Sequence, residues 1–132
     1  MKQLNIKTSQ QMEMIDITGE VRKVVKDSGM GRGICYVFVP HTSAGVTINE
    51  NTDPHVKEDI LNQLSKLVPQ KGEYKHGEGN AAAHIKTSIV GSSEVIFVEN
   101  GKLVLGAWQS IFLCEFDGPR SRNVLVKVVT ED

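Results

Sequence analysis

The residue pair that most constrains the fold is Asn100-Gly101. Asn-Gly is the strongest short signal for a type I′ hairpin turn, because both residues adopt positive φ at low cost. The strand-like residues 94–98 precede this turn, and further strand-like stretches follow at 108–116 and 123–129. The connections between neighbouring strands are too short for a crossover helix, so this third of the chain predicts an antiparallel sheet.

Strand and helix patterns alternate at the start of the chain. Residues 2–8 alternate between polar and apolar side chains, as a half-buried strand does. Valines then recur at helical spacing after a cap at Asp16 or Thr18, and this pattern stops at Gly29. A strand that leads into a helix is therefore expected.

The middle of the chain predicts another strand and a second helix. Residues 33–39 form a strand that ends at Pro40, which cannot donate a ladder hydrogen bond. Residues 46–48 alternate again, and we expect them to return as a neighbouring strand. Asp53 followed by proline begins the helix, which should stop before Pro69. Its buried stripe is expected to comprise Ile60, Leu61, Leu64 and Leu67.

These patterns predict one α+β domain over residues 1–132, a mainly antiparallel, sandwich-like β-sheet with helices packed against it. The 132 residues, of which 39% are hydrophobic, are enough for a self-supporting core. The sequence contains no repeat, no low-complexity tract and no linker rich in proline, glycine or serine.

Charge and composition argue against several classes of partner. The 15 basic and 16 acidic residues give a formal charge of −1, so no global field favours nucleic acid or an anionic membrane. No segment approaches the ~18 apolar residues of a membrane span, and the alternating start is unlike a signal peptide. Cys35 and Cys114 lie in apolar, strand-like runs, which indicates buried, reduced thiols. We therefore expect a cytoplasmic protein.

Polar side chains gather where the second expected strand ends. His41, Thr42 and Ser43 supply an imidazole and two hydroxyls, and Asn49 and Glu50 follow a few residues later. Mixed nitrogen and oxygen donors of this kind suit a polar ligand or a metal. The alternative is that the hydroxyls only close a turn. For His41 the ligand site is favoured, because a histidine at a strand end is free to face a cleft.

A second polar motif runs from His76 to His84. Gly77 and Gly79 let the backbone approach a ligand closely, and Asn80 is placed to cap a short, alanine-rich helix. The N-terminus of such a helix presents free N–H groups and a positive dipole to an anion, which makes a phosphate seat. The alternative is an ordinary surface loop, since the spacing of the two histidines is not a recognised zinc motif.

A third motif combines acids with arginines. Glu115 and Asp117 share one face of a strand, and a Gly-Pro turn then displays Arg120 and Arg122. Acids that hold Mg²⁺ and guanidiniums that bind phosphate form a diphosphate site, but an ion-paired turn without a substrate has the same pattern. Trp108, which enters an apolar strand, is expected in the core.

The order and spacing of these motifs resemble those of the YjbQ family over essentially the whole chain. Three matched blocks in one short chain are far more specific than any single motif. The resemblance implies a sandwich-like α+β subunit that assembles as a homotrimer with polar pockets near the subunit interfaces. The matching blocks are residues 40–47 with 49–50, residues 76–86, and residues 106–109 with 115–120.

The resemblance also implies an activity and a metal. Family members are described as secondary thiamine-phosphate synthases, which join a pyrimidine diphosphate to a thiazole phosphate and release diphosphate. The histidines of the family match His41, His76 and His84, where a divalent metal, zinc or magnesium, is the expected occupant. One departure is His55, which stands where the resemblance leads us to expect an acid, and we leave it out of the site.

The expected substrate is a small phosphorylated molecule, with neither nucleic acid nor a membrane as partner. The alternatives to the synthase are a metal-dependent hydrolase of a small phosphorylated metabolite and a non-catalytic trimer that binds a metal or an anion. The candidate catalytic residues are His41, Thr42, Ser43, Asn49, Glu50, Asn80, Glu115 and Asp117. The candidate phosphate ligands are Gly77, Gly79, Arg120 and Arg122.

Overall fold

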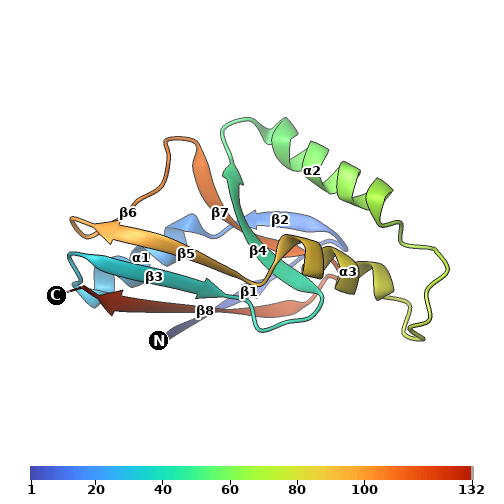
Figure 1. Ribbon diagram of the computed structural model, residues 1–132, viewed down its shortest axis with the longest axis horizontal. Helices are drawn as coiled ribbons and strands as arrows, with labels where there is room; N and C mark the ends of the chain where they lie inside the picture. The colour runs from blue at the N-terminus through green and yellow to red at the C-terminus, as the bar shows by residue number, and fades with distance from the viewer. Residues whose placement is uncertain (132) are drawn as a thin grey trace.

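The computed structural model describes residues 1–131, so position 132 of the expected domain lies outside the described residues. Over this range the chain forms eight strands and three helices (Figure 1). The strands are β1 (Lys2–Lys7), β2 (Glu13–Asp16), β3 (Gly33–Phe38), β4 (Ala44–Glu50), β5 (Ser93–Glu99), β6 (Lys102–Leu103), β7 (Gln109–Glu115) and β8 (Ser121–Thr130). The helices are α1 (Thr18–Ser28), α2 (Pro54–Leu67) and α3 (Ala81–Val90).

The strands form two antiparallel sheets. The five-stranded sheet has the order β1-β8-β3-β5-β6, and the three-stranded sheet has the order β2-β7-β4. Each strand pairing is antiparallel. The predicted fold class, α+β with mainly antiparallel strands, is confirmed. Within residues 1–131, no helix has the length and apolar character needed to cross a membrane.

Strand β7 is buried on both faces and connects two cores. Ile111 and Leu113 belong to the cluster that includes α1 and the five-stranded sheet. Phe112 and Cys114 belong to a second cluster, which α2 and α3 cover. Successive side chains of a strand point to opposite faces, so the run of apolar residues in β7 fills both clusters. The three-stranded sheet therefore forms the middle layer of the molecule.

Several local signals act as the sequence predicts. The side chain of Asp53 caps α2 by accepting a hydrogen bond from the backbone N–H of His55 at 2.9 Å. Helix α1 ends at Gly29, which has a φ of 68°. Asn100 and Gly101 have φ values of 52° and 74°, as a type I′ turn requires. Both cysteines are free and buried.

One expected strand pairing and two expected buried side chains are wrong. Strand β4 pairs with β7 and not with β3, because residues 39–43 carry the chain from one sheet to the other. Leu67 is exposed, and α2 has no fully buried residue because it packs on only one side of the middle layer. Trp108 is 66% exposed, because β7 begins only at Gln109 and the preceding turn holds the indole outside the core.

Candidate functional site

The connection between β3 and β4 places His41 beside the start of β8. Its Nε2 accepts a hydrogen bond from the backbone N–H of Asn123 at 2.9 Å. Nε2 is therefore unprotonated, and Nδ1 carries the proton of the neutral ring. Burial lowers the pKa of His41, and the nearby charge of Arg122 lowers it further, so the neutral ring prevails at pH 7.

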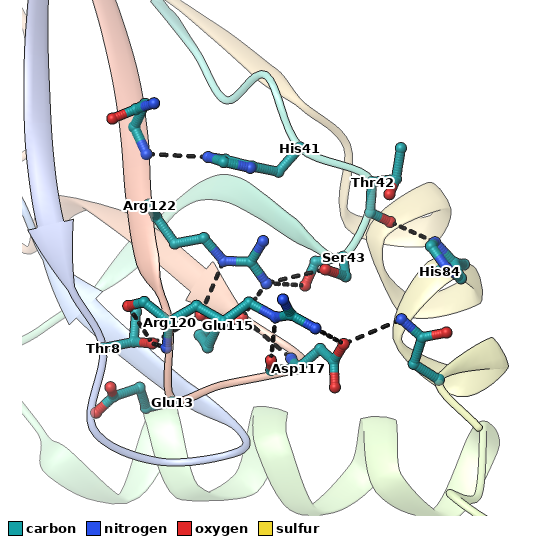
Figure 2. A network of polar contacts seen from close by, with 12 residues as sticks. Thr8, Glu13, His41, Thr42, Ser43, His84, Glu115, Asp117, Arg120 and Arg122 are labelled. Atoms are coloured by element: carbon teal, nitrogen blue, oxygen red, sulfur yellow. Dashed lines mark hydrogen bonds and ion pairs between the residues drawn. The ribbon is translucent and has the colours of Figure 1, made fainter. Parts of the chain in front are cut away.

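His84 comes from α3 and points toward the same connection (Figure 2). Its Nδ1 lies 3.0 Å from the carbonyl oxygen of Thr42. A carbonyl only accepts, so Nδ1 donates, and the neutral ring keeps its lone pair on Nε2. This hydrogen bond orients the ring, and an oriented imidazole with a free Nε2 suits metal binding or proton transfer.

His41 and His84 line one polar hollow, which we call the histidine pocket. Its volume is about 430 Å³, which lies within the usual range for small-molecule sites. The connection between the sheets, α3 and the turn before β5 contribute to it, so the pocket forms only when these segments pack together. Its lining includes His41, Thr42, His84, Thr87, Ser88 and Ser92.

His76 lies beside His84. The centroids of the two rings are 5.1 Å apart in an edge-on arrangement, and Nε2 of His76 lies 3.7 Å from the carboxylate of Glu78. Two adjacent imidazoles offer a divalent metal two nitrogen ligands. His41 does not complete a three-histidine set in this arrangement, because a backbone N–H already occupies its Nε2. In residues 1–131, no group of three or more histidine, cysteine, aspartate or glutamate side chains could hold a metal ion.

A buried ion pair lies behind the histidine pocket. Glu115, at the end of β7, is 0% exposed, and Arg122, at the start of β8, is 4% exposed. Arg122 donates through Nε to Oε1 of Glu115 at 2.9 Å and through Nη2 to Oε2. The same Nη2 donates to Oγ of Ser43 at 2.9 Å. The expected roles of Arg122 as a phosphate ligand and of Glu115 as a Mg²⁺ ligand therefore do not fit the geometry, because each group is engaged by the other inside the protein.

Thr8 completes this network, although no sequence signal pointed to it. Its Oγ1 donates a hydrogen bond to Oε1 of Glu115 at 2.7 Å. The same Oγ1 accepts a hydrogen bond from the backbone N–H of Arg120, also at 2.7 Å. Burial by itself would raise the pKa of Glu115, but hydrogen bonds from Arg122 and Thr8 outweigh it and lower the pKa. Glu115 thus remains ionised. A single threonine 107 residues away in the chain cannot be linked to Glu115 by spacing.

The loop between β7 and β8 keeps one guanidinium accessible. Oδ2 of Asp117 accepts hydrogen bonds from Nδ2 of Asn80 at 3.0 Å and from Nη2 of Arg120 at 2.9 Å. Burial would raise the pKa of Asp117, but these two bonds outweigh it and lower the pKa. The side chain of Arg120 is 53% exposed. Of the two arginines in the motif, Arg120 is the one that a ligand can reach.

The N-terminus of α3 faces the same loop. The side chain of Asn80 does not cap α3 as predicted; its one hydrogen bond in the described part of the chain is the donation from Nδ2 to Asp117. Its Oδ1 is buried and has no hydrogen-bond partner within residues 1–131. Gly79 adopts a φ of 78°, which glycine tolerates best, and a Cβ added at Gly77 or Gly79 would meet no other atom. The first three residues of α3, Ala81, Ala82 and Ala83, are buried, so the terminus acts on an anion through its positive dipole rather than through exposed N–H groups.

The structure does not bring Asn49 and Glu50 to this site. They end β4, whose other end at Ala44 adjoins the histidine pocket segment. At about 3.3 Å per residue, the two ends of this strand are roughly 20 Å apart. The side chain of Asn49 accepts a hydrogen bond from the backbone N–H of Glu50 at 2.7 Å. Within one chain, these two residues lie outside the site.

Lys86 is a buried charge that the sequence did not single out. Its side chain is almost fully buried, and its Nζ lies 3.3 Å from Sδ of Met12. Burial lowers the pKa of this lysine. Lys86 packs inside the protein and does not line the histidine pocket.

Curated relatives match nearly the whole chain. The family model described as UPF0047 protein YjbQ-like matches residues 2–131. The UPF0047 protein YugU of Bacillus subtilis is 49% identical over 130 residues, which cover 98% of each protein. A UPF0047 protein of Methanocaldococcus jannaschii is 50% identical over 124 residues, which cover 94% of this chain and 90% of the relative.

Solved structures match the fold as well. An uncharacterised conserved protein of the YjbQ/UPF0047 family from Clostridium acetobutylicum has a TM-score of 0.96 at 54% identity, with 98% of this chain and 100% of that chain covered. A YbjQ-like protein of unknown function from Sulfolobus solfataricus has a TM-score of 0.95 at 38% identity, with 98% and 96% covered. The sequence motifs, the two-sheet fold and these matches together show that the chain belongs to the YjbQ (UPF0047) family.

Proposed function

We propose that this chain is a secondary thiamine-phosphate synthase of the cytoplasm, which joins a pyrimidine diphosphate to a thiazole phosphate. The observation that supports this best is the grouping of an oriented imidazole, an accessible guanidinium and a helix N-terminus around one end of α3 (Figure 2). His84 lies one turn from Asn80, and Asn80 is linked through Asp117 to Arg120. Each of these groups suits a ligand that carries phosphate.

In this reaction the thiazole nitrogen attacks the methylene carbon of the pyrimidine. A C–N bond forms while the C–O bond to diphosphate breaks, and the diphosphate leaves with the electron pair. The protein must hold the two substrates in line and stabilise the charge of the leaving group. Nε and Nη2 of Arg120 each donate to Asp117, so Arg120 would bind diphosphate oxygens with its remaining N–H donors, and the positive dipole end of α3 would attract the same anion. Nε2 of His84, which the hydrogen bond from Nδ1 to Thr42 leaves free, would hold a divalent metal.

A divalent metal would neutralise part of the diphosphate charge when bound. The adjacent rings of His76 and His84 would hold zinc. The bonds from Asn80 and Arg120 use only Oδ2 of Asp117, so its Oδ1 would suit magnesium. Elemental analysis of protein purified without chelators tests this part. We expect bound zinc to be lost in His84→Ala, and unchanged zinc in that variant would exclude this residue as a ligand.

We also propose that the chain forms a homotrimer through the outer face of the five-stranded sheet. Tyr36 of β3 and Val95 of β5 are directly paired there. Phe38 lies on β3, Phe97 on β5 and Val129 on the neighbouring β8, and all five side chains are exposed. A contiguous apolar face of this kind marks a protein interface. Light scattering should give about three times the 14.5 kDa of one chain, and Phe97→Glu should reduce this mass. A monomeric wild-type protein would contradict the proposal.

The test of the activity is formation of thiamine phosphate from the two precursors with added Mg²⁺. Arg120→Lys keeps the charge but loses the fork, so we expect kcat/KM to fall at least about tenfold. His84→Ala should also lower it. The matched controls are Arg32→Lys and His55→Ala, which change the same residue types at exposed positions in other segments and should leave activity unchanged.

The outcomes separate the three functions under discussion. Full activity in both site variants would contradict the roles proposed for His84 and Arg120. Release of inorganic phosphate from either precursor, without thiamine phosphate, would identify a hydrolase. Binding of the precursors with no product of either kind would identify a binding protein.

A further inference from the structure

A second hollow lies far from the histidine pocket, between α1 and the hairpin of β5 and β6. We call it the hairpin hollow, and its volume is about 500 Å³. Strand β5 separates the two sites, because Ser92 before it lines the histidine pocket and Asn100 after it lines the hairpin hollow. This strand has seven residues, and at about 3.3 Å per residue it spans roughly 20 Å. The hairpin hollow is lined by Arg22, Val25, Lys26, Asn100, Lys102 and Leu103.

Three cations surround the hairpin hollow. Arg22 and Lys26 lie one turn apart on α1, and Lys102 faces them from β6. All three are exposed, and none forms an ion pair with another residue of the described range 1–131. Two acids lie nearby: Asp27 pairs with Lys23, and Glu99 is the cross-strand neighbour of Lys102 but makes its ion pair with Arg32. In a chain with a formal charge of −1, this cluster is a local positive field.

The floor of the hairpin hollow is apolar. Val25 belongs to the buried core, and Leu103 is half-buried against it. The alternative is that the three cations are only solvated surface charges. That alternative does not account for the concave apolar floor beneath them. A concave apolar surface with a few convergent polar groups is typical of a small-molecule site. The combination suits an anion that carries an apolar body.

We propose that the hairpin hollow binds a small phosphomonoester with an aromatic or aliphatic body. The phosphate lies between Arg22, Lys26 and Lys102, where the guanidinium contacts two oxygens and the lysines act as point charges. The apolar body packs on Val25 and Leu103. This site shares no lining residue with the histidine pocket, so it is independent of the proposed activity.

The probe for this site is phenyl phosphate, followed by chemical-shift perturbation of the backbone amides of ¹⁵N-labelled protein. We expect saturable shifts confined to α1 and to the turn at Asn100-Gly101. Inorganic phosphate lacks the apolar body and benzyl alcohol lacks the charge, so each should bind at least about fivefold more weakly. Added NaCl should weaken binding of the two anions and leave benzyl alcohol unaffected.

Variants assign the binding to the named residues. The double variant Lys26→Gln/Lys102→Gln should weaken phenyl phosphate at least about tenfold. The matched control Lys7→Gln/Lys66→Gln removes the same charge from exposed positions outside the hollow and should bind as the wild type does. Leu103→Ser should abolish the advantage of phenyl phosphate over inorganic phosphate.

Three results would overturn the inference. One is the absence of saturable shifts at α1 and the hairpin turn, including the case in which phenyl phosphate shifts only the histidine pocket. Another is an equal loss of affinity in the two double variants, which would mean a general charge effect. The third is equal binding of phenyl phosphate and inorganic phosphate by the wild type, which would mean that the apolar floor takes no part. Circular dichroism of each variant ensures that a lost signal is not lost folding.

Discussion

Replacing Glu115 by glutamine should destabilise the protein far more than the small change in size suggests. Glutamine has nearly the same shape as glutamate, so the substitution leaves no cavity. It does remove the carboxylate opposite Arg122, whose side chain is only 4% exposed. Removal of one partner from a buried ion pair costs about 3–5 kcal/mol, because the remaining charge stays desolvated.

The expected loss is large enough to measure by calorimetry or urea unfolding at one protein concentration. For a chain of this size, each kcal/mol corresponds to roughly 3–5 °C, so the thermal midpoint should fall by about 9–25 °C. The matched control is Glu131→Gln. Glu131 lies 3.2 Å from Arg32, but the two side chains are 53% and 61% exposed, so this pair should contribute less than about 1 kcal/mol.

Two further measurements test the same reasoning. The double variant Glu115→Leu/Arg122→Met should recover most of the lost stability, because it removes both charges together. The pKa of Glu115 is lowered from its usual value of 4.5, so its contribution is full above pH 4.5 and is lost as the pH falls through the lowered pKa. Glu115→Gln should flatten this acid dependence. A single variant within about 1 kcal/mol of the wild type would refute the role given to the buried pair.

Three other predictions concern packing and protonation. Gly45→Ala should lower the free energy of unfolding by at least about 2 kcal/mol, because a Cβ there would collide with the backbone carbonyl of Gly91, which follows α3. Gly77→Ala is the control, since its Cβ meets open space and should be nearly neutral, and equal urea midpoints for the two variants would contradict this. The pKa of His41 is lowered below 6.5 in the folded protein, so the unfolded chain binds more protons there and the free energy of unfolding should fall as the pH drops below 6.5. If His41→Asn shows the same dependence of this free energy on pH, another group causes the fall. Burial raises the pKa of Cys35 to about 11 and of Cys114 to about 12, so both thiols should resist iodoacetamide at pH 8 in the native protein and react once urea unfolds it. Rapid alkylation of the native protein would be inconsistent with their burial.

The candidate site was partly predictable from short motifs. Each motif predicted a polar segment at the end of a strand or the start of a helix, and His41, His84 and Arg120 do lie in such places. The motifs could not tell which arginine is accessible. Arg120 and Arg122 are equivalent in the sequence pattern, but only the fold buries one of them against Glu115.

The sequence by itself determined the features whose free energy comes from a few adjacent residues. The turn at Asn100-Gly101, the cap at Asp53 and the helix end at Gly29 depend on local φ preferences and local hydrogen bonds, so no distant segment is needed to explain them. Cys114 was also predictable as buried, because an apolar strand has few places outside a core.

The tertiary structure alone decided which strands pair and which charges meet. Strand β4 has apolar residues that fit either sheet, and only the route of residues 39–43 places it beside β7. Thr8 and Glu115 are 107 residues apart, and their hydrogen bond exists because β1 and β2 bring Thr8 to the end of β7. Burial and ion pairing are sums over segments that are remote in sequence, and spacing along the chain carries no information about such sums.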